Sequence, residues 1–165
     1  MSEARSSQPA RLGVHFLIAQ IGAHAAAKFA ERLETLHLTP PQGGILGMIN
    51  RKDGLSQQTL ADLLGIFPSR LVLMLDELQA SGLIERRTHT TDRRTYALHL
   101  TANGKKALQA IGRIARQHEE AVCAALNENE RQILASLLSR IAEEQQLRPG
   151  VHPGYRRLEK RGEGQ

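Results

Sequence analysis

Four arginines between positions 86 and 94 are the side chains of this sequence best suited to a defined chemistry. Arg86 and Arg87 form one adjacent pair, Arg93 and Arg94 form another, and the polar run THTTD separates them. A guanidinium group stays charged at neutral pH and offers a planar fork of donors that matches phosphate oxygens. The pattern therefore predicts contact with a polyanion such as duplex DNA, although a solvated run of charges would also explain it.

The positive charge of the chain is concentrated in two segments. The 165-residue sequence has a formal net charge of +5. Residues 85–106 hold six basic and two acidic side chains, a net of +4, and residues 148–165 hold five and two, a net of +3. The rest of the chain is therefore slightly acidic, and this local basicity is typical of a nucleic-acid footprint.

The other chemistry-bearing residues show no catalytic or metal-binding pattern. None of the seven histidines stands four residues from another, and Cys123 is the single cysteine, so neither a zinc site nor an internal disulfide is predicted. Neighbouring acids such as Asp76 and Glu77 would project about 100° apart on a helix, which does not suit a shared acid–base site. We expect no catalytic residues, no cofactor and no metal.

The composition favours a cytoplasmic protein. A single cysteine fits a reducing compartment. The longest uncharged stretch, residues 12–27, contains His15, Gln20 and His24 and is too short to cross a bilayer. Residues 1–11 are polar and do not resemble a signal peptide, so they are expected to form a flexible N-terminus. We expect no membrane partner.

Hydrophobic periodicity and capping residues predict six helices and one hairpin. The expected helices span residues 12–36, 40–50, 57–64, 68–81, 102–126 and 128–147, and the expected strands span residues 83–88 and 95–100. Thr39, Ser56, Thr101 and Asn127 are suited to cap the helices that follow them. Gly65 fits a left-handed helix end.

The fourth helix has one apolar face and one outward face. Its inward residues, at i, i+3, i+4 and i+7 spacing, are Leu71, Met74, Leu75 and Leu78. Its outward residues are Ser69, Arg70, Val72 and Leu73. In a short helix pair followed by a hairpin, the second helix can enter a DNA major groove and the hairpin can reach the neighbouring minor groove.

The order of these elements and several short motifs resemble the MarR (multiple antibiotic resistance regulator) family. The motifs are TPPQ at 39–42, LA at 60–61, LG at 64–65, DEL at 76–78, GLIER at 82–86, DRR at 92–94 and LHLT at 98–101. The implied fold is mainly α, an α+β winged helix-turn-helix with six helices and a two-stranded wing.

The resemblance covers residues 12–147 and implies a single domain. Dimerisation helices over residues 12–36 and 102–147, from both chain ends, flank a winged helix-turn-helix over residues 39–101. Residues 148–165 are rich in proline, glycine and charge and are expected to form a flexible basic tail. The terminal helices each carry a wide apolar stripe, which favours a dimer, with a monomeric helical bundle as the alternative.

The resemblance implies a ligand-responsive transcriptional repressor that binds a pseudo-palindromic operator as a homodimer. Arg94 resembles the wing-tip arginine that enters the minor groove, and Asp92 resembles the carboxylate that braces the wing. The alternative is a winged-helix protein-interaction module that binds no DNA and docks through its fourth helix.

The residues expected to contact DNA lie on the third helix, the fourth helix and the wing. They are Gln57, Gln58, Ser69, Arg70, Val72, Leu73, Arg86, Arg87, Arg93 and Arg94. Ser69 and Arg70 can bind phosphates or base edges, whereas the two apolar residues could contact thymine methyl groups. The alternatives are a protein contact for Val72 and Leu73 and simple solvation for the glutamines.

Two adjacent glycines in the second helix, Gly43 and Gly44, depart from the family pattern. They could open space for a small-molecule effector, or they could allow close helix packing. The candidate residues for such a pocket are His15, Phe16, His24, Gly43, Gly44 and Met48. Relatives that sense peroxide use a cysteine in the first helix, so Cys123, late in the fifth, is expected to be a small core residue.

Overall fold

The computed structural model describes residues 12–88, 96–152 and Tyr155, and these residues form six α-helices and a small antiparallel sheet. The elements are α1 (Val14–Leu33), η1 (Glu34–Leu36), α2 (Pro40–Arg51), β1 (Leu55–Ser56), α3 (Gln57–Leu64), α4 (Pro68–Ala80), β2 (Ile84–Thr88), β3 (Tyr96–Leu100), α5 (Ala102–Val122) and α6 (Glu128–Glu144). The mainly helical winged-helix fold expected from the sequence is confirmed.

Side-chain caps begin most of the helices. Thr39 and Gln42 form a capping box at α2, and Asn127 and Glu130 form another at α6. The Thr101 hydroxyl accepts a hydrogen bond from the Gly104 amide at 3.0 Å, at the start of α5. Each cap satisfies an amide that the helix itself leaves unpaired, so these starts are encoded locally.

The observed helix ends match the predicted ones where a glycine follows the helix. Gly65 ends α3 with φ of 68°, and Gly82 follows α4 with φ of 67°, both in the left-handed region that glycine adopts without strain. The first helix differs from expectation. It ends at Leu33, a 3₁₀ turn follows, and His37 adopts φ of 54°.

The sheet has one strand more than the sequence predicted. Its order is β1-β3-β2, with both pairs antiparallel. Leu55 in β1 pairs with Leu98 in β3, and Ile84 in β2 pairs with Leu100. The additional strand, β1, has two residues, which are too few to show an alternating pattern in the sequence. It is recognised only by its pairing with β3 in the structure.

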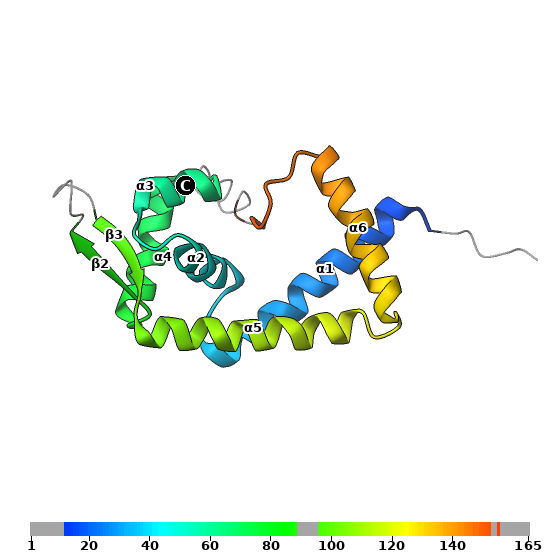
Figure 1. Ribbon diagram of the computed structural model, residues 1–165, viewed down its shortest axis with the longest axis horizontal. Coiled ribbons are helices and arrows are strands. Elements are labelled where there is room, and N and C mark those ends of the chain that lie inside the picture. The colour runs from blue at the N-terminus through cyan, green and yellow to red at the C-terminus, as the bar shows by residue number, and fades with distance from the viewer. Residues whose placement is uncertain (1–11, 89–95, 153–154, 156–165) are drawn as a thin grey trace, which may run out of the picture.

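The molecule has two lobes, joined by the long helix α5 (Figure 1). We call α2 to β3 the winged lobe, and α1, α6 and the distal part of α5 the helical lobe. The winged lobe holds most of the buried core, whose fully buried large side chains include Ile45, Leu46, Ile49, Leu60, Leu71, Leu75, Leu78, Ile84 and Leu98. In the helical lobe, apolar side chains of α1 and α6 stay largely exposed.

Within the described ranges, no single helix is long and apolar enough to cross a membrane. The bent pair of α3 and α4 meets that test by length and composition when the two are taken together.

Candidate nucleic-acid interface

The helices α3 and α4 form a helix-turn-helix at one end of the winged lobe (Figure 1). The two helices meet at 113°, within the range of about 90–120° of this motif. Ser56 caps α3 through the Thr59 amide at 3.1 Å. Pro68 begins α4 at a position where the missing N–H costs nothing.

The apolar inner face of α4 fixes which residues it can present. Leu71, Leu75 and Leu78 are buried in the core as predicted, because they share one side of the helix. On the other side Ser69 is exposed and Leu73 is 65% exposed. The two remaining outward candidates, Arg70 and Val72, are half-buried.

Arg86 is the centre of a hydrogen-bond network at the base of the wing. Its Nε donates to Gln57 Oε1 at 2.7 Å, its Nη1 to Gln79 Oε1 at 2.7 Å and its Nη2 to Asp76 Oδ1 at 2.6 Å. These partners come from α3 and α4, while Arg86 belongs to β2. One guanidinium therefore joins both helices of the helix-turn-helix to the first strand of the wing.

The strand alternation explains why Arg86 points inward. Ile84 is buried, and residues two apart on a strand share a face, so the Arg86 side chain is only 16% exposed. Arg87 has the opposite orientation, is 62% exposed and pairs with Glu85. From the sequence, both arginines were predicted to contact DNA. The alternation of inward and outward residues along a strand could have distinguished the inward Arg86 from the outward Arg87.

The two glutamine candidates on α3 already have partners within the chain. Gln57 accepts from Arg86, while exposed Gln58 donates from Nε2 to Asp62 Oδ1 at 2.9 Å along its own helix. Gln57 is thus a brace of the wing as well as a candidate contact, a role that the sequence analysis missed.

The base of the wing is fixed to neighbouring elements by two further links. The Thr101 hydroxyl donates to the Gly82 carbonyl at 2.7 Å, at the junction of the sheet and α5. His99 Nδ1 lies 2.8 Å from Asp53 Oδ1, which connects β3 to the turn before β1. These links hold the described strands of the wing, β2 and β3, against the rest of the lobe. Asp92, Arg93 and Arg94, which were expected at the wing tip, lie outside the described residues.

The helix α2 is also connected to α4. Gln42, which closes the capping box, donates from Nε2 to Glu77 Oε2 at 2.8 Å. This amide is buried, and its two contacts set the position of α4 relative to α2. The sequence predicted the capping contact of Gln42 but not the second one.

The residues suggested for an effector pocket are spread over two helices. His15, Phe16 and His24 are exposed on α1, and Met48 is half-buried on α2. A Cβ built on Gly43 would lie 3.6 Å from the Ile111 side chain of α5, which is an ordinary contact distance, so this buried position has room for a methyl group. Gly44 makes room, and the Tyr155 side chain of this same chain fills that room.

Comparison with known proteins identifies the family. The MarR family model matches residues 38–96. A protein of Thauera aromatica, named "Putative transcriptional regulatory protein for hcr operon", is 36% identical over 136 residues, which cover 82% of this chain and 81% of that protein. This chain belongs to the MarR family.

Solved MarR-family structures include proteins held on DNA. The transcriptional repressor CouR bound to a 23-mer DNA duplex has 29% identity and a TM-score of 0.70, over 86% of this chain and 99% of CouR. The MepR–DNA complex of S. aureus has 25% identity and a TM-score of 0.67, over 81% and 98%. The present chain is therefore a DNA-binding transcriptional regulator of this family, whose members are not enzymes.

Proposed function

We propose that this regulator acts in the cytoplasm as a homodimer on a pseudo-palindromic duplex operator, as a ligand-responsive repressor. The observation that carries the proposal is an apolar groove between helices from opposite ends of the chain. It lies between α1 and α6 and has a volume of about 940 Å³. None of the six candidate effector residues lines it.

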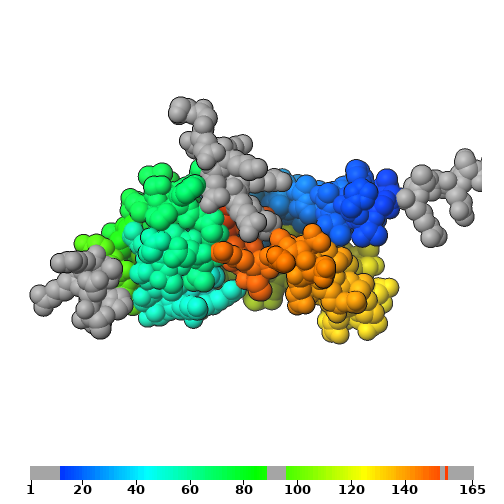
Figure 2. Space-filling view, turned by 90° about the horizontal axis from the view of Figure 1, so that it is seen from above, coloured from blue at the N-terminus to red at the C-terminus, as the bar shows by residue number. Residues whose placement is uncertain are grey.

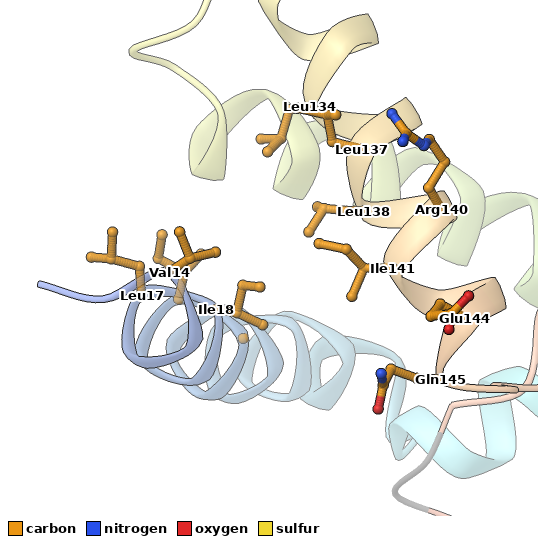
Figure 3. A pocket seen from close by; sticks show the side chains of 12 residues that line it. Val14, Leu17, Ile18, Leu134, Leu137, Leu138, Arg140, Ile141, Glu144 and Gln145 are labelled. Carbon is orange, nitrogen blue, oxygen red and sulfur yellow. The ribbon is translucent and has the colours of Figure 1, made fainter.

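The groove is lined by large apolar side chains that a single chain leaves in contact with water. Leu17 and Ile18 of α1 face Leu138 and Ile141 of α6 across it (Figure 3). Eight of these lining side chains are between 38% and 68% exposed, namely Val14, Leu17, Ile18, Ile21, Leu134, Leu137, Leu138 and Ile141. An exposed apolar patch of this kind is typical of a protein or membrane contact or of a ligand-binding groove, and we assign this one to a protein interface.

A second copy of this chain is the occupant that fits the groove. The side chains of Arg140 and Glu144, of opposite charge, lie at its edge. In a two-fold interface the same surface meets itself, so each Arg140 can lie opposite the partner copy's acidic edge. Pairing would also fix the distance between the two α4 helices, which must reach half-sites about 34–36 Å apart.

Within each half-site, α4 would lie in the major groove and the wing beside the minor groove. Ser69, Leu73 and Arg87 have the exposure that such contacts require. Arg86 already uses three donors within the chain, so we assign it to positioning the wing. Arg93 and Arg94 remain the proposed minor-groove and phosphate contacts, with Asp92 as the proposed brace of the hairpin.

The ligand response completes the proposal. A ligand that changes the angle between the two lobes would change the distance between the two α4 helices of the dimer. The affinity for DNA would change with that distance. The six candidate residues on α1 and α2 remain the proposed effector site, and at Gly44 an effector would have to displace the Tyr155 side chain that occupies that space.

Substitution of the wing arginine tests the assignment of the DNA contacts. We expect Arg94→Ala to weaken operator binding and to lower the slope of log affinity against log salt by about one unit, as one phosphate-region charge is lost. The measurement is a gel shift on a selected operator over a series of salt concentrations. Unchanged affinity with an unchanged slope would contradict the wing assignment.

A further inference from the structure

The chain turns back toward the winged lobe after α6. Gln146 adopts φ of 53°, and the Leu147 amide donates to the Ala142 carbonyl at 2.9 Å, which ends the helix with a left-handed turn. Figure 1 shows the orange segment leaving α6 and crossing to the side of α2 and α3. We call residues 147–152 together with Tyr155 the strap.

The first anchor of the strap is Arg148. Its Nη1 donates to the carbonyl oxygens of Asp62 at 2.6 Å and Leu63 at 3.2 Å, in the last turn of α3. A cation at a helix C-terminus satisfies free carbonyls and opposes the negative end of the helix dipole. A Cβ on Gly65 would lie 3.5 Å from Arg148 Nη1, an ordinary contact distance, so this position is glycine because of its left-handed φ of 68° and not because of Arg148.

The second anchor is Tyr155, which is only 4% exposed. Its hydroxyl donates to the Pro41 carbonyl at 2.5 Å in the first turn of α2. A Cβ on Gly44 would overlap the Tyr155 hydroxyl, so this site exists only because position 44 is glycine. Burial raises the pKa of the Tyr155 phenol above its ordinary value.

The sequence analysis treated residues 148–165 as a flexible tail, and the structure differs for residues 148–152 and Tyr155. Val151 packs against the core between the two anchors. In Figure 2 the orange and red segment lies between the winged lobe and the helical lobe. Although this segment is rich in proline and glycine, two long-range anchors hold its described residues against the winged lobe.

We propose that the strap is a latch that fixes the angle between the lobes, and that seating Tyr155 over Gly44 sets the DNA affinity of the dimer. Its first residues continue from α6, which lines the dimer groove, and its anchors hold α2 and α3 of the winged lobe. The strap thus connects the dimer surface to the DNA-reading helices by a second route besides α5. This inference rests on the proposed function for its effect on DNA, whereas the seating of Tyr155 does not depend on it.

Tyrosine ionisation tests the latch without DNA. The chain has two tyrosines and no tryptophan, and Tyr96 is 53% exposed. In a Tyr96→Phe background, we expect no tyrosinate absorbance to appear near pH 10, the ordinary pKa of tyrosine. Adding Gly44→Ala should displace the ring and restore ionisation near pH 10.

A matched control uses the same helix. A Cβ on Gly47 meets nothing within 4 Å, so Gly47→Ala in the Tyr96→Phe background should leave Tyr155 protected. Ionisation near pH 10 without the Gly44 change would show that Tyr155 is not seated, which overturns the latch.

Operator affinity tests the coupling. We expect Gly44→Ala and Tyr155→Phe to change affinity by about fivefold or more, within the range of allosteric coupling between sites, and to alter the preferred half-site spacing. Gly47→Ala should leave both unchanged. A released Tyr155 with unaltered affinity and spacing would overturn the coupling. If the unmodified chain forms no dimer or binds no DNA, the proposed function is refuted. The tyrosine ionisation result would still show whether Tyr155 is seated over Gly44.

Discussion

At the scale of single residues, Arg86 shows how one side chain can organise a surface. Its guanidinium offers donors in a fixed plane, and three of these meet acceptors on two different helices. A lysine has one flexible ammonium group and could not span the same three positions. The direction of the wing therefore depends on an arginine that is itself mostly covered.

Substitution of Arg86 should cost more folding stability than substitution of Arg87. We expect Arg86→Ala to lower the free energy of unfolding by about 2 kcal/mol, because it removes charge-assisted hydrogen bonds and leaves Gln57 and Gln79 without their partner. Arg87→Ala should cost under about 1 kcal/mol, as its ion pair is exposed. Urea unfolding of both variants measures the values, and equal losses would refute the positioning role of Arg86.

A second residue-scale feature is His118 of α5, which packs against Phe29 of α1 with ring centroids 5.4 Å apart. Its Nδ1 has no hydrogen-bond partner within the described part of the chain. Desolvation first, and then the charges of Arg32 and His24, lower the pKa of this imidazole below its ordinary value, against a backbone hydrogen bond to Ala25 that works the other way. The neutral form is therefore the one that fits the α1–α5 contact.

This shift sets the direction of a pH effect. Since the folded pKa lies below the unfolded value of about 6.5, the contribution of His118 is fully present above that pH. It is lost as the pH falls from about 6.5 through the folded pKa. We expect His118→Phe to lose less stability than the original chain between pH 8 and 5 in thermal unfolding. Parallel pH profiles for the two proteins would show that His118 has no such role.

At the scale of the element, α4 separates the residues that hold it from those that it presents. Its buried leucines are fixed in the core, while Leu73 is 65% exposed on the far side. An exposed apolar side chain on such a helix contributes little to folding, but it can contact a thymine methyl in the major groove.

Leu73→Ala should therefore separate folding from recognition. We expect the unfolding free energy to change by less than about 0.5 kcal/mol, while operator affinity falls by about 1 kcal/mol through loss of one base contact. Fluorescence anisotropy with labelled duplex measures binding, and Leu75→Ala provides the contrast, because a buried leucine costs about 2–5 kcal/mol of stability when truncated. Full affinity in the Leu73 variant would remove this residue from the interface.

At the scale of the whole molecule, the helical lobe leaves an apolar groove exposed in the single chain. The apolar side chains that line the groove between α1 and α6 come from opposite ends of the sequence. Burial of an aliphatic side chain of this size contributes about 1.5–3 kcal/mol, so pairing of two such lobes would be strongly favoured. Neither end of the chain forms this surface alone.

A charge placed in the groove tests the association. We expect Leu138→Asp to shift the protein from dimer to monomer in sedimentation velocity, because an unpaired carboxylate would be buried at the interface. DNA binding should fall with it. Gln132→Asp introduces the same charge on α6 away from the groove and should leave the dimer intact. A dimer that survives the Leu138 change would place the subunit interface elsewhere.

The sequence by itself determined the features that depend on near neighbours. The caps at Thr39, Ser56 and Asn127, and the left-handed glycine at position 65, involve residues within three or four positions of each other. Because these contacts lie within one turn of chain, the starts and ends of these helices could be predicted from residue spacing alone. The likeness of the motifs to the MarR family then gave the function.

Only the tertiary structure decided which side chains are already engaged. Arg86 meets Gln57 across 29 positions, Tyr155 meets Pro41 across 114, and the two walls of the groove come from opposite chain ends. An arginine that binds phosphate and one that braces a wing have the same sequence pattern, as do a flexible tail and an anchored strap. Their difference lies in partners that folding brings from far along the chain, and no local spacing encodes that distance.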